Sequence, residues 1–201
     1  MKWTTVRSSP AHDFRFFQVR TLTRQSPSGI IHDFVVIDSV DWVVVIALTA
    51  DNQVVMVEQF RHGTNTIELE IPGGMIDPED PSPIAAGERE LREETGYSGD
   101  QAQILATVSP NPAFMSNDCQ IIVVQNCVRR HETAFDHTEQ IATSLVPVDE
   151  INRLVAEGRI RHSLVLVALY HFDLWRRGFR RHASLPIRSG PPSPLRGERA
   201  G

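Results

Sequence analysis

The charged run Glu88-Arg89-Glu90-Leu91-Arg92-Glu93-Glu94 is the part of the chain whose residue types and spacing could carry chemistry. On a helix, Glu90 and Glu94 lie four residues apart on one face, and Glu93 lies one step around it. Like charges at this spacing repel each other, and a divalent cation would offset the repulsion. Carboxylate oxygens are the ligands that Mg²⁺ prefers, and magnesium sites also bind substrate phosphates. The run therefore favours a cation site, although a solvated helix face laced with ion pairs would give the same residues.

Glycine and proline residues frame this predicted helix. Gly73-Gly74 ends a strand ahead of it, and a backbone carbonyl in that turn could complete a metal site. Pro81-Ser82-Pro83 can begin the helix, because proline is tolerated in a first turn and serine caps the free N–H groups. The segment up to Thr95 contains no further proline, and Gly96 supplies the left-handed residue that commonly ends a helix.

Strands lie on both sides of this helix, and two more helices follow them. Apolar and β-branched runs predict strands at Phe14 to Thr23, Ile30 to Ile37, Trp42 to Leu48, Val54 to Phe60, Ile67 to Ile71, Gln103 to Ser109, Gln120 to Val128 and Ala142 to Pro147. Helices are expected at Asp149 to Glu157 and at about Arg161 to Arg177. This order predicts an α+β fold with α/β/α layers rather than a parallel βαβ series.

Charge and composition exclude several classes of protein. The net charge is −5, and arginines concentrate after Arg176, so the rest of the chain is strongly acidic. An acidic body argues against nucleic-acid binding, which needs basic side chains to displace counterions. Lys2 is the one lysine in the sequence, which leaves no residue for a P-loop or a Schiff base. The longest apolar runs are too short to cross a membrane, and no signal-peptide pattern opens the sequence, so we expect a cytoplasmic protein.

The charged run lies inside a longer pattern that resembles the Nudix box, Gly-x5-Glu-x7-Arg-Glu-U-x-Glu-Glu-x-Gly-U, in which U is apolar. Here the pattern reads Gly74-x5-Asp80-x8-Arg89-Glu90-Leu91-x-Glu93-Glu94-x-Gly96-Tyr97. Every defined position from Arg89 to Tyr97 matches. Asp80 stands where glutamate is usual, and its spacing to Arg89 is one residue longer.

The resemblance implies a set of site residues. Glu90, Glu94 and the backbone carbonyl of Gly73 are expected to bind Mg²⁺, with Mn²⁺ as the alternative ion, and Glu93 is expected to assist them. Arg89 lies four residues before Glu93, so it can pair with that carboxylate and hold it in place.

Flanking residues resemble one branch of the Nudix family, the ADP-ribose pyrophosphatases and nucleotide-sugar hydrolases. These residues are Glu58-Gln59-Phe60-Arg61, Glu68 to Gly74, and the terminal helix pair at Asp149 to Leu174. In that branch the arginine contacts the diphosphate, which implies this role for Arg61, and Glu70 is implied to lie near the substrate. From the residues alone, Arg61 could equally be a surface charge at a strand end, and Glu70 an outward-facing strand residue.

The same resemblance points to a catalytic base and to a substrate loop. The base in this branch is often a carboxylate in the loop before the penultimate strand, which implies Glu139, with Asp136 second and Glu93 as a further alternative. The stretch Asn111 to Ser116 corresponds to a substrate loop of relatives, so Asn111 and Met115 are candidate substrate-binding residues, or else members of a rigid turn.

Two histidines near the last helix, His162 and His171, are expected to cap or decorate it. The other histidines show no spacing typical of metal ligands.

The whole pattern implies a Mg²⁺-dependent hydrolase that cleaves the diphosphate of ADP-ribose or a related nucleoside diphosphate sugar. Three regions are expected: N-terminal strands at residues 1–40, a Nudix domain at 41–182, and a disordered basic tail at 183–201. The branch also implies a homodimer formed through the N-terminal strands, a small-molecule nucleotide as substrate, and no nucleic-acid or membrane partner. The alternative is a non-catalytic Nudix-fold module that senses ADP-ribose-like nucleotides.

Overall fold

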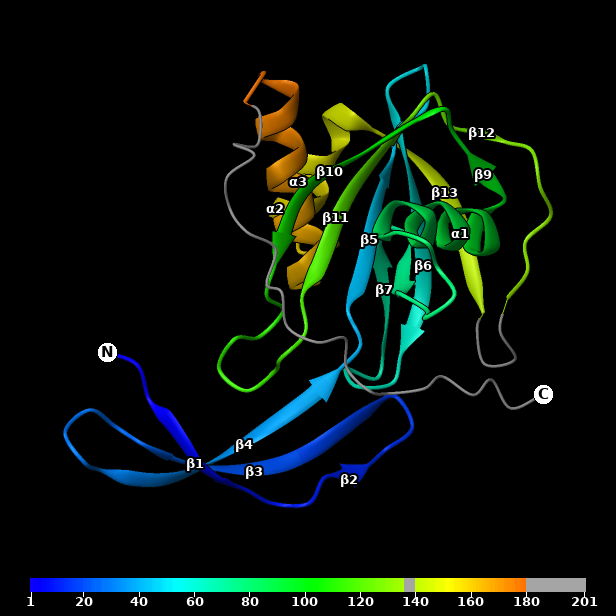
Figure 1. Cartoon of the computed structure of the whole chain (residues 1–201). Helices are drawn as coiled ribbons and strands as arrows, with labels where there is room; N and C mark the ends of the chain where they lie inside the picture. Colours follow the sequence, from blue (N-terminus) through cyan, green and yellow to red (C-terminus); the bar gives the residue numbers. More distant parts are fainter. Residues whose placement is uncertain (136–139, 180–201) are drawn as a thin grey trace. The chain divides into compact units, whose positions relative to one another are not determined.

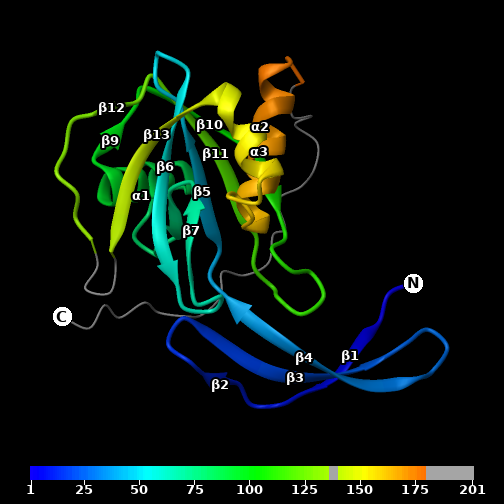
Figure 2. The same cartoon turned by 180° about the vertical axis from the view of Figure 1, so that it is seen from behind.

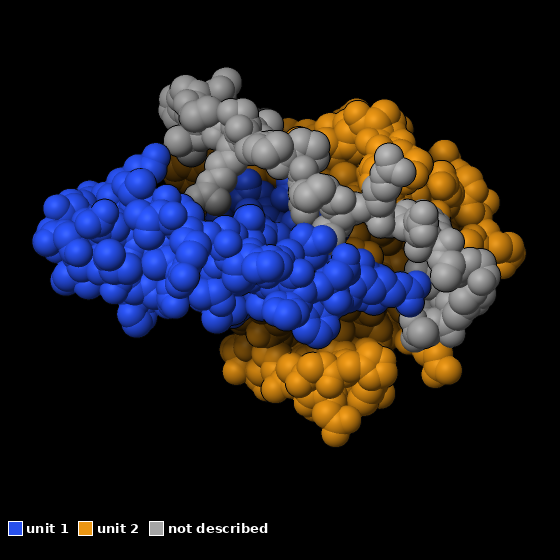
Figure 3. All heavy atoms as spheres, turned by 60° about the horizontal axis from the view of Figure 1, so that its bottom comes forward, with its two compact units in different colours: residues 1–41, 109–118, 188–201 blue, residues 42–108, 119–187 orange. Residues whose placement is uncertain are grey.

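The computed structural model describes residues 1–135 and 140–179 (Figure 1). Asp136, Glu139 and the expected tail at 183–201 lie outside the described residues. The described residues divide into two compact units, shown in different colours in Figure 3. The smaller unit contains residues 1–41 and 109–118, and the larger unit contains residues 42–108, 119–135 and 140–179.

A mixed sheet forms the centre of the larger unit. Its strand order is β10-β11-β5-β8, with bounds Gln101–Val108, Cys119–Gln125, Trp42–Ala47 and Gly73–Met75. Strands β11 and β5 run parallel, and the other two pairs are antiparallel. A second, antiparallel sheet has the order β13-β6-β7, with bounds Ile141–Pro147, Gln53–Arg61 and Thr66–Glu70. A short pair, β9 (Tyr97–Ser98) and β12 (Val128–Arg129), completes the unit.

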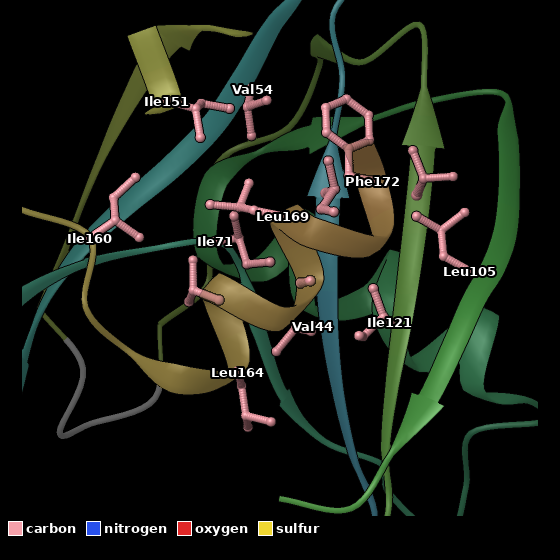
Figure 4. Close-up of a cluster of buried hydrophobic side chains, with 14 of the residues drawn as sticks. Val44, Val54, Ile71, Leu105, Ile121, Ile151, Ile160, Leu164, Leu169 and Phe172 are labelled. Atoms are coloured by element: carbon pink, nitrogen blue, oxygen red, sulfur yellow. The ribbon is translucent and has the colours of Figure 1, made fainter. Parts of the chain in front are cut away.

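Helices cover both faces of the central sheet (Figures 1 and 2). Helix α1 (Pro83–Thr95) lies on one side, while α2 (Ile151–Ala156) and α3 (Ser163–Arg176) lie on the other. Alternate residues of a strand face opposite sides of its sheet, and β5 follows this rule. Val44 and Ile46 belong to the buried cluster that includes residues of α3, part of which is drawn in Figure 4. Val43 and Val45 belong to the second cluster, with Ala86 and Leu91 of α1. This is the layered α+β arrangement that the element order predicts.

Helix α1 begins and ends as the sequence predicts. The Ser82 hydroxyl accepts a hydrogen bond from the backbone N–H of Ala85, and Pro83 is the first helical residue. Gly96 has a φ of 74°, and its N–H donates to the carbonyl of Arg92. Because both caps are satisfied, the helix is fixed along its length and its register sets where the glutamates point.

The smaller unit is an antiparallel sheet built around β3 (Phe17–Gln25). It pairs with β1 (Thr4–Ser8), β2 (His12–Asp13) and β4 (Ile31–Ser39). Residues 109–118 join the same unit, where Met115 forms a parallel bridge to Ile37. Nine large apolar side chains on this unit are exposed: Met1, Val6, Phe14, Phe16, Ile30, Ile31, Phe34, Val35 and Phe114.

The structure adds strands that the sequence did not predict, namely β1, β2, β8, β9 and β12, and two expected boundaries also differ. The strand expected through Val128 ends at Gln125, because Asn126 has a φ of 55° and turns the chain. The helix expected from Asp149 begins as a 3₁₀ turn at Val148–Glu150 before α2 follows. In the described part of the chain, no helix is both long and apolar enough to cross a bilayer.

Candidate active site

The glycine turn at β8 meets the last turn of α1. The backbone N–H of Gly73 donates a hydrogen bond to Oε2 of Glu94 over 3.1 Å. Glu94 is only 3% exposed, so its carboxylate is oriented by this bond inside the protein. A Cβ atom on Gly73 would lie 2.3 Å from the carbonyl oxygen of Val43, so only glycine allows β8 to approach β5 this closely.

Glu90 reaches the same turn from one helical turn earlier. A Cβ atom on Gly74 would lie 2.5 Å from Oε1 of Glu90, which places this carboxylate directly against the glycine. Glu90 also accepts a hydrogen bond of 2.9 Å from Nη1 of Arg89. The structure therefore brings Gly73, Glu90 and Glu94 together at one turn, as the spacing of the motif predicts.

Arg89 links the helix to the loop between β8 and α1. Its Nε and Nη2 atoms donate to the two oxygens of Asp80 over 3.1 and 2.9 Å, and Nη2 also donates to the carbonyl of Met75 over 3.0 Å. Nη1 reaches Oε2 of Glu93 at 3.1 Å, which is the expected pairing. The hydrogen bonds that Arg89 donates to Asp80 first, and the charge of Glu90 next, raise the pKa of Arg89, so it stays a cation.

The extra residue in the loop is absorbed without loss of the Asp80–Arg89 contact. The backbone N–H of Asp77 donates to Oδ2 of Asp80 over 2.9 Å, and the N–H of Asp80 donates back to the carbonyl of Asp77 over 3.1 Å. This reciprocal pair forms a compact turn that aims the Asp80 carboxylate at the guanidinium. The shorter side chain and the longer loop therefore compensate for each other.

Glu93 lies at the open edge of this cluster. Its side chain is 30% exposed, more than that of Glu90 at 14%. A partly exposed carboxylate can reach both a bound water and the solvent, which suits a proton acceptor. The competing candidates Glu139 and Asp136 lie outside the described residues.

A second polar cluster joins β6, β7 and the start of α3. Arg61 donates to both oxygens of Glu70, from Nε over 2.8 Å and from Nη2 over 2.7 Å. Glu70 is 2% exposed, so it is a buried residue and not an outward-facing one. Burial alone would raise the pKa of Glu70, but hydrogen bonds from Arg61 and His162 outweigh burial and lower this pKa to about 2.

His162 is the member of this cluster that the sequence did not reveal. It was expected to cap or decorate the last helix, and it does hold the N-cap position of α3. Its side chain makes no capping bond there, and instead its Nδ1 atom lies 2.8 Å from Oε2 of Glu70. The contact joins residues 92 positions apart, and no local sequence pattern predicts such a pair.

Asn111 and Met115 belong to the smaller unit. The side-chain oxygen of Asn111 accepts a hydrogen bond from the N–H of Ala113 over 3.3 Å, and its carbonyl accepts one from the N–H of Met115 over 2.8 Å. The turn is attached to the end of β4, because Ile37 donates its N–H to Phe114 and accepts one from Ser116. These contacts describe an ordered turn, and the substrate-binding role of its residues stays a prediction.

The donor set at the glycine turn fits a hard divalent cation. Two carboxylates of α1 approach the same backbone turn, and carboxylate oxygens with backbone oxygens, waters and phosphates are what Mg²⁺ binds. Within residues 1–135 and 140–179, no group of three or more His, Cys, Asp or Glu side chains could by itself hold a metal ion. The side chains at this turn that could ligate a cation are therefore those of Glu90 and Glu94, and its other ligands would be backbone oxygens, water and substrate.

This chain is similar in sequence to one protein family and to several characterised proteins. Residues 40–167 match the family model described as the NUDIX domain. The chain is 28% identical over 172 residues to the methanol dehydrogenase activator of Bacillus methanolicus, which covers 85% of this chain and 92% of that protein. It is 25% identical over 176 residues to the ADP-ribose pyrophosphatase of Mycobacterium tuberculosis, which covers 87% of this chain and 85% of that protein.

The fold is similar to that of a solved structure as well. A crystal structure of an ADP compounds hydrolase superposes with a TM-score of 0.79 at 21% sequence identity, covering 89% of this chain and 96% of that one. At this identity the similarity supports the fold and not a particular substrate.

Proposed function

This chain belongs to the Nudix family and is a Nudix hydrolase, and we propose that it cleaves the diphosphate of ADP-ribose or of a related nucleoside diphosphate sugar. The products would be a nucleoside monophosphate and a sugar phosphate. The observation that carries the proposal is the approach of Glu90 and Glu94 to the Gly73-Gly74 turn. The substrate class is supported by the relative from Mycobacterium tuberculosis, which is named an ADP-ribose pyrophosphatase.

In this proposal, Glu90, Glu94 and the carbonyl of Gly73 hold Mg²⁺, or Mn²⁺ in its place. A bound divalent cation polarises a phosphoryl oxygen and lowers the pKa of its water. The chain contributes the orientation of the donors, because Glu94 is fixed by the N–H of Gly73 and Glu90 by Arg89. Oriented donors bind without the cost of rearranging at the moment of reaction.

In the same proposal, other polar residues bind the substrate and accept the proton. Arg61 contacts the diphosphate, and its pairing with Glu70 fixes the plane of the guanidinium. Glu93 or Glu139 accepts the proton from the attacking water. Arg89 holds Glu90 and Glu93 through its Nη1 atom and neutralises part of their charge.

The smaller unit supplies the assembly surface in this proposal. Its exposed apolar residues, such as Phe34 and Val35 on β4, are costly in water and are buried when two copies pair as a homodimer. A substrate-binding role for Asn111 and Met115, in the same unit, is part of this proposal. We place the protein in the cytoplasm, with a small nucleotide as its ligand and no nucleic-acid partner. Sedimentation of the full chain tests the dimer: a monomer at micromolar concentration would contradict it.

A substrate panel tests the proposed activity. Product release is measured from ADP-ribose, GDP-mannose, UDP-glucose, NADH and diadenosine polyphosphates, each with Mg²⁺ and with a chelator. Metal-dependent release of a nucleoside monophosphate from ADP-ribose or a nucleotide sugar is the expected result. If no compound of the panel releases product, the proposed activity is contradicted. A rise in the melting temperature of the protein with ADP-ribose would then favour a sensing module.

A further inference from the structure

Strand β7 carries two buried carboxylates that both meet the segment leading into α3. Glu68 and Glu70 are 5% and 2% exposed, and their alternation places both on one face of the strand. Arg161 donates to the carboxylate of Glu68 from Nε over 2.9 Å, and His162 contacts Glu70. Arg161 and His162 are therefore neighbours that bind the carboxylates of Glu68 and Glu70. Of these two carboxylates, that of Glu70 also binds Arg61.

The carboxylate of Glu70 is shared between two partners. Its Oε1 accepts from Nε of Arg61, and its Oε2 accepts from Nη2 of Arg61 over 2.7 Å and lies 2.8 Å from Nδ1 of His162. A paired, two-bond contact fixes the plane of a guanidinium. The side chain of Arg61 is 41% exposed, so the oriented group still reaches the surface, where a ligand can meet it.

The proton in the histidine contact belongs to the ring. The pKa of Glu70 is lowered to about 2, so near neutral pH this carboxylate is ionised and can only accept hydrogen bonds. Nδ1 of His162 must therefore carry the hydrogen, whichever state Nε2 adopts. The ring is therefore a donor to Oε2, the same oxygen that Nη2 of Arg61 contacts.

We propose that His162 is a positioning residue that, through Glu70, orients Arg61 toward the diphosphate of the substrate. The inference rests on the proposed function, in which Arg61 makes that contact. Without the Nδ1–H donor, Oε2 loses one of its partners, and the Glu70–Arg61 pair gains freedom to rotate. The arginine then has to be ordered when substrate binds, which weakens binding more than it slows the chemical step.

Variants of His162 test the role through a split between KM and kcat. His162→Ala should raise KM for ADP-ribose about tenfold while kcat changes by about twofold at most. His162→Asn should restore KM, because its side-chain NH₂ lies near the place of Nδ1. Should His162→Ala fail to fold, His162→Gln takes its place, since its amide reaches the position of Nε2 and not of Nδ1.

A double-variant cycle separates positioning from a merely structural role. If His162 acts through Arg61, adding His162→Ala to Arg61→Ala should cost nothing further in kcat/KM. Arg161→Gln is the matched control, because it loosens the same two elements at Glu68 without touching Glu70. It should lower the melting temperature and leave KM within about twofold of the unmodified chain.

Several results would overturn the inference. Additive losses in the cycle, no rescue by His162→Asn, or an equal rise in KM with Arg161→Gln would each show that His162 only ties α3 to β7. These failures leave turnover by the unmodified chain intact, so they are distinct from failure of the proposed function. If the unmodified chain shows no turnover, the same cycle is run on the Kd for ADP-ribose by calorimetry without metal. Absence of both binding and turnover would overturn the function and the positioning role together.

Discussion

The backbone N–H of Gly73 and the Oε2 atom of Glu94 form a hydrogen bond of 3.1 Å across 21 residues of sequence. The bond joins a glycine of strand β8 to Glu94 of helix α1, which is almost completely buried. A carboxylate held in this way has its direction set before any ligand arrives. The glycine turn therefore sets the direction of a carboxylate on the acidic face of α1.

Gly74→Ala tests how closely the turn and the helix must approach. The new Cβ would lie 2.5 Å from Oε1 of Glu90, so the carboxylate has to move away. Turnover of ADP-ribose should fall about a hundredfold, because a shift of about 1 Å in a group of the active site can lower the rate by this factor. Gly63→Ala is the control, since nothing lies within 4 Å of its Cβ position, and its kinetics should stay unchanged. Equal kinetics for the two variants would show that the close approach does not matter.

Asp80→Asn tests the brace that holds Arg89. The substitution keeps the shape of the side chain but removes the charge from a residue whose side chain is 8% exposed. The free energy of unfolding should fall by roughly 1–3 kcal/mol, as for other buried charged hydrogen bonds. Asp77→Asn is the control, because Asp77 lies farther from the guanidinium, at 3.5 Å. Urea unfolding measures both, and a larger loss for Asp77→Asn would contradict the assignment of Asp80 as the main partner.

Glu70 predicts how stability depends on pH. Its folded pKa of about 2 lies below the ordinary value of 4.5, so the folded state binds this proton less readily than the unfolded state. The stabilisation is present above about pH 4.5 and is lost as the pH falls toward 2. Its size is roughly 2–3 kcal/mol.

Glu70→Gln should remove that part of the pH dependence. Urea unfolding between pH 5 and pH 2.5 would show a shallower fall for the variant, and the contribution of Glu68, whose pKa is also about 2, would remain. Glu157→Gln is the control, because that residue forms an exposed ion pair with Arg153, and such pairs contribute little. If Glu70→Gln and the unmodified chain followed one curve, the lowered pKa would be wrong.

The sequence predicted the elements of the site better than the contacts between distant parts. Local signals were sufficient for α1, because the Ser82 cap, the proline and Gly96 each act within one turn. The spacing of Glu90 and Glu94 likewise decides that they share a face, and the fold then carries that face to the glycine turn. The strand end at Gln125 was missed because it depends on a left-handed Asn126, a conformation that asparagine adopts only in some contexts.

The His162–Glu70 contact shows what local patterns cannot supply. A histidine at a helix N-cap normally indicates capping or surface exposure, and a glutamate in a strand normally indicates a solvent-facing position. The two residues pair because the tertiary fold brings β7 next to the start of α3. The choice among Glu93, Asp136 and Glu139 as the base stays a prediction, since two of the three lie outside the described residues.

Glu94→Gln gives the most direct test of the central claim, that the carboxylates at the glycine turn hold the cation for diphosphate hydrolysis. The amide keeps the shape of the side chain and can still accept from Gly73, so the melting temperature should stay within a few degrees. AMP released from ADP-ribose is measured over a range of Mg²⁺ concentrations for this variant and for the unmodified chain. We predict metal-dependent release by the unmodified chain and a loss of roughly a thousandfold in kcat for the variant. Retained turnover in a folded Glu94→Gln variant would contradict the account.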